Sequence, residues 1–188
     1  MTSKDSFIVT TWAFKIFEIF RSFSIYSFCI SPGFRNSILI YAAQKNREFK
    51  LSSHIDERSA AYFALGVSKV TKVPSVLICT SGTAVANYYP AVIEASYSRN
   101  PLIILTADRP SKLIDSGDNQ TIKQKNIFSN HVRSFFDLGM PKSNTKKLNK
   151  KICDAILTAL GKNNKVPLPP GPVHINIPLG EPIIDYSL

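Results

Sequence analysis

The chain has 188 residues, enough for one domain with a substantial core, and its 44% hydrophobic and 19% charged residues are typical of a globular protein. No apolar run reaches the roughly 18 residues that a membrane-spanning helix needs, so we expect no membrane insertion. The formal net charge of +10 comes without an aromatic-interleaved basic motif or zinc-finger spacing. We therefore expect a lysine-rich solvated surface and no nucleic-acid partner.

Strand-like and helix-like runs alternate along the chain. The first run, residues 7–30, reads as an amphipathic helix followed by a strand, because charged residues interrupt it at helical spacing and no signal-peptide cleavage site follows. The later expected elements, in chain order, are helix 36–47, strand 49–55, helix 56–70, strand 73–80, helix 83–98, strand 100–107, a long polar loop, strand 131–138, helix 146–160 and strand 171–178.

This alternation predicts the fold class. Continuously apolar strands such as VLIC and LIIL suit a parallel sheet that is buried on both faces. Strands separated by helices of a dozen or more residues imply right-handed crossovers, so we expect an α/β fold with a doubly wound, mainly parallel sheet flanked by helices. We expect residues 1–188 to form a single domain.

Cysteine and histidine usage gives no sign of a metal site. Cys29, Cys79 and Cys153 lack CxxC spacing, and two of them lie in apolar strand-like runs. Buried free thiols in a reducing cytoplasm are the expected state. The three histidines also lack the spacing of metal ligands, so we predict no metal ligand in this chain.

Polar motifs follow four consecutive strands of the predicted sheet. SPGFRN, HIDER, CTSGTAVAN and TADRP come after the first, second, third and fourth strand. Strand-to-helix loops of a parallel sheet share its carboxyl edge, where ligands bind in open α/β folds. Since a sheet without a ligand needs only short turns there, the four motifs together predict a site at this edge.

Taken singly, each motif has an ordinary structural interpretation as well. Asp56 and Glu57 can simply start a helix, where acids offset the positive end of the dipole. Asp108 and Arg109 can pair with each other, or the arginine can recognise a substrate carboxylate. Arg35 opposes the dipole at the start of the next helix unless an anion binds there. TSGTAVAN lacks the lysine and the spacing of a P-loop.

The order and spacing of these motifs together are specific. SPGFRN, SSHIDERSAAYFALG, LICTSGTAVANYYPAVIEAS, PLIILTADRP, DNQTIKQ, FSNHVR and GPVHINIPLGEP resemble the amino-terminal domain of a family of thiamine-diphosphate enzymes. This family is the 2-succinyl-5-enolpyruvyl-6-hydroxy-3-cyclohexene-1-carboxylate synthases of menaquinone biosynthesis. The resemblance covers nearly the whole chain. Acetolactate synthase and other thiamine enzymes share the Glu-then-TSG layout but not TADRP followed by DNQ.

The resemblance implies an activity and a set of site residues. The family decarboxylates 2-oxoglutarate on thiamine diphosphate and adds the product to isochorismate. Glu57 matches the catalytic carboxylate that hydrogen-bonds N1′ of the aminopyrimidine and promotes loss of the thiazolium C2 proton, and Asp56 is left as the helix cap. Among the other matching positions, Arg35 and Arg109 would bind substrate carboxylates, Asn119 and the catalytic Gln120 would orient substrate, and Pro32, Gly33, Thr83 and Asn87 would shape the pyrimidine pocket.

The resemblance also implies what lies outside this chain. Family members bind the diphosphate and Mg²⁺ through a second domain with a GDG motif, which does not occur here. We therefore expect the pyrimidine-binding domain alone, without the central and diphosphate domains, inactive by itself, from a cytoplasmic homodimer or tetramer. Phe34 stands where the family usually has Ser. The alternatives are another thiamine-dependent decarboxylase or carboligase, and a non-catalytic binding or assembly module.

Overall fold

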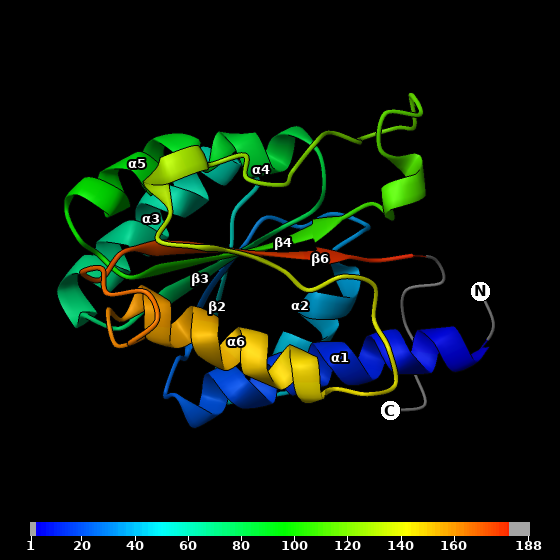
Figure 1. Cartoon of the computed structure of the whole chain (residues 1–188), viewed down its shortest axis with the longest axis horizontal. Helices are drawn as coiled ribbons and strands as arrows, with labels where there is room; N and C mark the ends of the chain where they lie inside the picture. The colour runs from blue at the N-terminus through cyan, green and yellow to red at the C-terminus, as the bar shows by residue number, and fades with distance from the viewer. Residues whose placement is uncertain (1–2, 181–188) are drawn as a thin grey trace.

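Within residues 3–180, which the computed structural model describes, six strands form one sheet in the order β2-β1-β3-β4-β6-β5 (Figure 1). Every neighbouring pair of strands is parallel. The chain starts at the inner strand β1, continues to the edge strand β2 and then crosses back through β3 and β4 to the other edge strand, β5, before β6 inserts between β4 and β5. This confirms the predicted doubly wound parallel sheet.

The strands are β1 (Ser27–Ile30), β2 (Lys50–Ser53), β3 (Ser75–Cys79), β4 (Leu102–Asp108), β5 (Phe135–Asp137) and β6 (Pro172–Pro178). The α-helices are α1 (Ser3–Ser22), α2 (Ser37–Gln44), α3 (Glu57–Thr71), α4 (Thr83–Asn87), α5 (Tyr89–Tyr97) and α6 (Lys146–Ala159). Two short 3₁₀ helices, η1 (Ser111–Leu113) and η2 (Ser129–His131), lie in the connection from β4 to β5.

Helices cover both faces of the sheet (Figure 1). The alternation of side chains along each central strand sets the two layers: Val76 and Ile78 of β3 pack in the core beneath α1, α2 and α6, whereas Leu77 and Cys79 pack beneath α3, α4 and α5. Both sets are apolar because both faces are buried. This is why the strands read as continuous apolar runs in the sequence.

The predicted helix over 83–98 is wrong in one respect, because the structure divides it into α4 and α5. Pro90 lies in the first turn of α5, where a missing backbone N–H costs nothing. The turn between the helices centres on Tyr88, whose N–H donates to Val85 O at 3.2 Å in a 3₁₀-type bond. The break leaves α4 as a short helix that begins directly at the carboxyl end of β3.

The predicted strand over 131–138 is mostly irregular, and only Phe135–Asp137 pairs with β6. His131 ends η2 instead. The other elements agree with the prediction to within a few residues. None of the described helices combines the length and the hydropathy that crossing a membrane requires.

Candidate functional site

The four predicted loops lie at the carboxyl edge of the parallel sheet. The backbone N–H of Ser31 donates to Ile78 O at 2.9 Å, and that of His54 donates to Ile30 O at 2.8 Å. These bonds continue the ladder past the ends of β1 and β2 and hold the first residue of each loop beside the neighbouring strand. The predicted convergence of the loops is therefore confirmed.

Asp56 and Glu57, at the start of α3, make different hydrogen bonds. Asp56 is the N-cap, and its carboxylate accepts from the backbone N–H of Ser59 at 2.7 Å. This bond satisfies one of the free N–H groups of the first turn. Hydrogen bonding by the side chain of Ser59, together with its backbone N–H, holds the pKa of Asp56 below its usual range. The prediction that Asp56 caps the helix is confirmed. Glu57 is thereby left available for another role.

The Glu57 carboxylate is half-buried and is tied to a second rim loop. Its Oε2 accepts from Nδ2 of Asn87, the last residue of α4, at 3.0 Å. Its Oε1 has no hydrogen-bond partner among the described residues. The amide of Asn87 therefore fixes the carboxylate through one of its two oxygens. Of the predicted pyrimidine-pocket residues, the structure thus brings Glu57 and Asn87 together.

The SPG turn packs tightly against the end of β3. A Cβ placed on Gly33 would lie 2.6 Å from Cβ of Thr80, a distance that real side chains do not reach. The Gly33 N–H donates to Oδ1 of Asn36 at 2.8 Å, which closes the turn. Pro32, in the turn, and Thr83, in the first turn of α4, are both exposed. Gly33 is therefore required by close approach rather than by a left-handed backbone.

Gly82 begins α4 in a conformation that favours glycine, with φ +86° and ψ −147°. A Cβ there would lie 3.1 Å from both Cγ and O of Gln120. The hydroxyl of Ser81 donates to the same Gln120 O at 2.9 Å. The TSG loop therefore sets the position of Gln120, although the two are far apart in sequence.

Arg35 and Arg109 line one pocket of about 650 Å³ at the rim. Arg35 is only 5% exposed and donates from Nη1 to Leu179 O at 3.1 Å. The described lining contains a third cation, Lys112, and two acids, Asp5 and Asp118. We call this space, lined by Arg35, Arg109 and Lys112, the arginine pocket. Guanidinium groups are the side chains that bind carboxylates in a bidentate manner, so this pocket is a candidate site for a carboxylate ligand.

The side chains of Asp108 and Arg109 are directed to different partners. Asp108 accepts from the backbone N–H of Arg109 at 2.7 Å, whereas the Arg109 guanidinium donates to Asn119 O at 2.8 Å and lies 3.5 Å from Asp118. Arg109 is therefore directed toward the arginine pocket and toward the DNQ loop. Burial raises the pKa of the Asp108 carboxyl, although the bonds from Asn176 and Arg109 oppose that shift.

A buried polar network beneath the rim was not predicted from the sequence. Thr106 donates to Oδ1 of Asn176 at 2.7 Å, so its hydroxyl accepts from Nε2 of His174 at 2.8 Å. Asn176 Nδ2 donates to Asp108 at 2.7 Å, and Gln124 Nε2 donates to Asn176 Oδ1 at 2.8 Å. Gln124, the second glutamine of DNQTIKQ, lies in an exposed loop, but its own side chain is completely buried. Nothing in the sequence pattern sets it apart from the polar residues around it.

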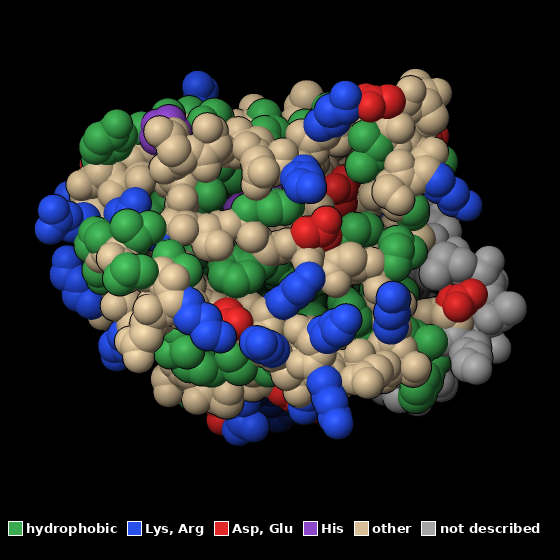
Figure 2. Space-filling model, in the orientation of Figure 1, with side chains coloured by type: hydrophobic (Ala, Val, Ile, Leu, Met, Phe, Trp, Pro, Cys, Tyr) green, Lys and Arg blue, Asp and Glu red, His purple; other side chains and the backbone are tan. Residues whose placement is uncertain are grey.

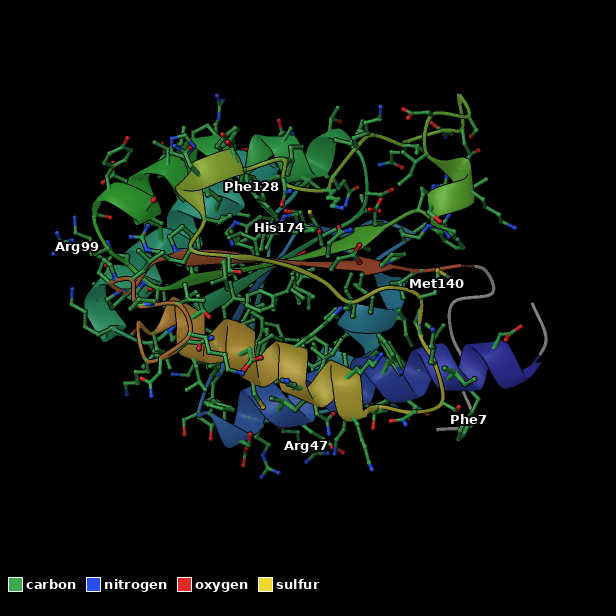
Figure 3. All side chains as sticks on the ribbon, viewed as in Figure 1. Phe7, Arg47, Arg99, Phe128, Met140 and His174 are labelled. Carbon is green, nitrogen blue, oxygen red and sulfur yellow. The ribbon has the colours of Figure 1, made fainter. Side chains whose placement is uncertain are left out.

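His174 makes the stability of the domain sensitive to acid. Its ring packs against that of Phe128 (Figure 3) and against that of Phe135. Burial lowers the pKa of His174 to about 3. The unfolded chain binds this proton below pH ~6.5, whereas the folded chain does not until about pH 3. As the pH is lowered from about 6.5 to about 3, the free energy of unfolding is therefore expected to fall by about 1.4 kcal/mol per pH unit.

Urea unfolding of the 188-residue chain at a series of pH values between about 7 and 4 measures this slope. His174→Gln keeps an amide N–H that can reach Thr106 but carries no titrating group. Its slope is expected to be smaller than that of the wild-type chain by the histidine contribution. Equal slopes for the two proteins would contradict the assignment of a buried neutral imidazole.

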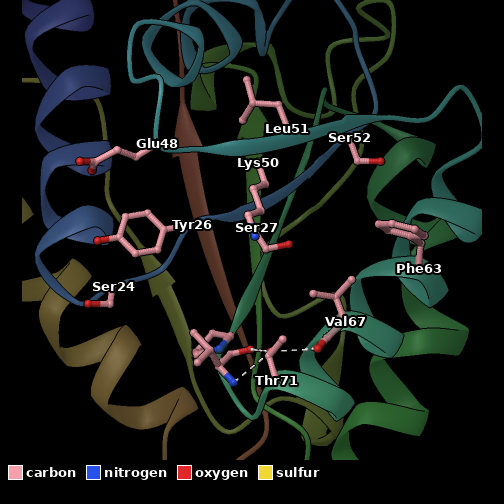
Figure 4. Close-up of a pocket in the computed structure, with 12 residues that line it drawn as sticks. Ser24, Tyr26, Ser27, Glu48, Lys50, Leu51, Ser52, Phe63, Val67 and Thr71 are labelled. Atoms are coloured by element: carbon pink, nitrogen blue, oxygen red, sulfur yellow. Dashed lines mark hydrogen bonds between the residues drawn. The ribbon is translucent and has the colours of Figure 1, made fainter.

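A second pocket, of about 510 Å³, lies at the opposite end of the sheet between β2 and α3 (Figure 4). Apolar side chains such as Phe63 and Val67 line much of it. Its acid, Glu48, accepts from Arg21 at 2.6 Å. Because ligands of open α/β sheets bind at the carboxyl ends of the strands, the rim is the better candidate for the functional site.

Other features agree with the composition. Figure 2 shows Lys and Arg side chains over the exposed face of α6, with polar and acidic side chains among them. The lysines of this helix include Lys146, Lys147, Lys150 and Lys151.

The cysteines are free thiols. Cys29 and Cys79 are buried, as predicted, and burial raises the pKa of Cys29 to about 12. In the described part of the chain, no three His, Cys, Asp or Glu residues are grouped to hold a metal ion.

Comparison with known proteins connects this rim to a family. Residues 10–127 match the family described as thiamine pyrophosphate enzyme, N-terminal TPP binding domain. The 2-succinyl-5-enolpyruvyl-6-hydroxy-3-cyclohexene-1-carboxylate synthase of Chlorobium phaeobacteroides is 45% identical over 188 residues, which is 100% of this chain and 31% of the relative. The synthase of the same name from Flavobacterium johnsoniae is 47% identical over 169 residues, or 90% of this chain and 29% of the relative.

A solved structure supports the fold. Benzoylformate decarboxylase from Polynucleobacter necessarius superposes with a TM-score of 0.73 at 18% identity, covering 88% of this chain and 29% of the decarboxylase chain. The chain thus spans about 30% of the length of the curated relatives that it matches. The resemblance to these synthases is confirmed. The chain belongs to the thiamine pyrophosphate enzymes and carries their N-terminal TPP-binding domain.

Proposed function

We propose that this chain is the pyrimidine-binding domain of a synthase that decarboxylates 2-oxoglutarate and adds the remaining four-carbon unit to isochorismate in menaquinone biosynthesis. The names of its relatives support this reaction. The observation that carries it is an arginine pocket with two guanidinium groups at the same rim as the Glu57 carboxylate, which Asn87 fixes through one oxygen. Both substrates are dicarboxylates, which bidentate arginines recognise.

The residues at the rim fit thiamine diphosphate. When bound, the cofactor would act as an electron sink for the electron pair that remains on the substrate when a 2-oxo acid loses CO₂. Glu57 would hold a proton at N1′ of the aminopyrimidine, and Asn87 would keep the carboxylate in place through its bond to Oε2. Pro32, Gly33 and Thr83 shape the pocket around the ring, where the close approach of Gly33 to Thr80 keeps the turn compact.

The arginine pocket holds the substrates. Arg35 is the more buried of the two arginines and is anchored by Leu179 O, so it presents a fixed guanidinium to a carboxylate. Arg109 is fixed by Asn119 O. The side chains of Asn119 and Gln120 are exposed on the adjacent loop and orient the substrate near the reacting carbon.

Arg109→Lys is expected to raise KM for the dicarboxylate substrates by about tenfold or more, because an ammonium group cannot make two parallel hydrogen bonds to a carboxylate. Steady-state kinetics of the complete enzyme measures the effect. Lys112→Gln is the matched control, since this exposed side chain lies at the edge of the same pocket and is expected to change KM by less than Arg109→Lys. An unchanged KM in Arg109→Lys would contradict this role.

The proposal includes three features of the complete enzyme that lie outside this chain. The diphosphate and Mg²⁺ are held by a second domain, the active enzyme is a homodimer or tetramer, and it works in the cytoplasm. These features are taken from the family resemblance.

Turnover by the complete enzyme tests the proposed reaction directly. With thiamine diphosphate, Mg²⁺, 2-oxoglutarate and isochorismate we expect CO₂ release that depends on both substrates. The 188-residue chain alone is expected to show no turnover under these conditions. Turnover of a different 2-oxo acid with no use of isochorismate would instead favour another thiamine-dependent decarboxylase or carboligase. Detectable turnover by the isolated chain would contradict the division of the active site between domains.

A further inference from the structure

Gln124 is a buried amide on an otherwise exposed part of the β4–β5 connection. It is 0% exposed, while its neighbours Lys123 and Lys125 face solvent. Its Nε2 donates to Ala107 O at 3.1 Å and to Asn176 Oδ1 at 2.8 Å, and its Oε1 accepts from the Gly82 N–H at 2.9 Å. A rotated amide would place N–H against N–H and oxygen against two acceptors, so only one orientation satisfies the site.

The oxygen of this amide controls the start of α4. Gly82 is held by Gln124 Oε1, and it lies against Gln120, four residues before Gln124 in the same loop. Ser81, the next residue toward β3, donates to Gln120 O. Gln124 therefore closes a compact unit of the TSG loop and the DNQ loop. A change in its side chain is transmitted to Gln120 through a contact and two hydrogen bonds.

The nitrogen of the same amide controls Arg109. Gln124 and Thr106 both donate to Asn176 Oδ1, which leaves Asn176 Nδ2 directed at Asp108 Oδ2. The other oxygen of Asp108 accepts from the Arg109 N–H at 2.7 Å. This series of bonds sets the direction in which Arg109 leaves β4 toward the arginine pocket.

We propose that Gln124 is a positioning residue for the reaction proposed above, because one buried amide fixes both Gln120 and Arg109 although its own hydrogen bonds go to Gly82, Ala107 and Asn176. This inference rests on the proposed function for its kinetic consequences but not for its structural ones. Gln124 joins four segments: the ends of β3, β4 and β6 and the DNQ loop. Without it, the two active-site groups would each depend on separate, exposed contacts.

Two variants of the complete enzyme separate the two arms of the network, which are the Gln120 arm, from Oε1 through Gly82, and the Arg109 arm, from Nε2 through Asn176 and Asp108. Gln124→Met has a similar length and no hydrogen-bonding group, so it releases both arms. Gln124→Glu keeps an acceptor toward Gly82 and replaces the donor that faces Ala107 O and Asn176 Oδ1, so it releases the Arg109 arm alone. Ile156→Val, a core change under the opposite face of the sheet, is the control for a general loss of stability.

In Gln124→Met we expect kcat to fall and KM for the dicarboxylates to rise, each by about tenfold, with amide exchange of residues 80–84 and 118–121 faster by about tenfold. In Gln124→Glu we expect the rise in KM with exchange at 80–84 near that of the wild type. Hydrogen exchange followed by mass spectrometry and steady-state kinetics give both readouts. Ile156→Val is expected to lower Tm without changing kcat, KM or exchange in these segments.

Kinetics within twofold of wild type in a folded Gln124→Met would overturn the proposal, whatever its Tm, because Gln124 would then be structural only. If Gln124→Met does not fold, an unchanged KM in Gln124→Glu overturns it. A wild-type enzyme without activity on these substrates would refute the proposed function instead. In that case the exchange of residues 80–84 and 118–121 in Gln124→Met still decides whether Gln124 holds the two loops.

Discussion

Glu57→Gln in the complete enzyme is expected to lower kcat by about a thousandfold while the fold is preserved. The amide has the same shape and can still contact Asn87, but it cannot hold a proton at a ring nitrogen as a carboxylate does. Steady-state turnover of 2-oxoglutarate with isochorismate measures the loss. Circular dichroism and Tm are expected to match those of the wild type.

The neighbouring acid provides a control for this variant. Asp56→Asn also replaces a carboxylate by an amide, one residue earlier, but asparagine is as good an N-cap as aspartate. It is therefore expected to keep kcat within about twofold of the wild type. Equal losses in the two variants would show that the effect is a general change in charge at the start of α3 and would remove Glu57 from its special role.

Gly82→Ala is expected to reduce both stability and activity. The backbone at φ +86° and ψ −147° is strained for any residue with a Cβ, at a cost of about 1–3 kcal/mol. The new methyl group would also lie 3.1 Å from the backbone O of Gln120, so the DNQ loop must move. We expect the urea midpoint of the 188-residue chain to fall and kcat of the complete enzyme to drop.

Gly66→Ala is the matched control. Gly66 lies within α3, and a Cβ there meets nothing within 4 Å. Alanine in the middle of a helix is better than glycine by about 0.5–1 kcal/mol, so this variant is expected to be stabilised and fully active. If Gly82→Ala were as stable and active as Gly66→Ala, the close contact between the TSG and DNQ loops would not exist in solution.

The sheet could be predicted from the sequence because its elements are long and regular. Apolar strands such as 73–80 and 100–107 alternate with helical patterns, and parallel pairing follows from the length of the crossovers. The division of α4 from α5 was missed because the apolar periodicity continues through Tyr88 and Pro90. A proline that is tolerated at the start of a new helix gives the same pattern as one in a kinked helix.

The rim was predictable for a related reason, and the network beneath it was not. The carboxyl ends of parallel strands must meet, so four polar loops that follow four strands share one edge. The Asp56 cap also follows from local rules and is confirmed. The bonds among Thr106, Asn176 and Gln124 depend instead on β4 lying beside β6, which are far apart in the sequence. No local pattern encodes such a pairing.

The family resemblance contributed what neither periodicity nor topology could supply. It predicted a catalytic role for Glu57 rather than for Asp56, and it predicted membership of the thiamine pyrophosphate enzymes, which the comparison shows. The structure adds that the two acids already differ in their contacts: Asp56 bonds to its own helix, and Glu57 reaches across the rim to Asn87.

The rate of exchange of the C2 proton of bound thiamine diphosphate, measured in D₂O for the complete wild-type enzyme and for Glu57→Gln, reports whether the Glu57 carboxylate activates the cofactor. This rate reports on the carboxylate before any substrate binds, so it does not depend on the identity of the substrates. We expect rapid exchange in the wild type and a loss of about a thousandfold in Glu57→Gln. Exchange at the wild-type rate in Glu57→Gln would show that this carboxylate does not activate the cofactor.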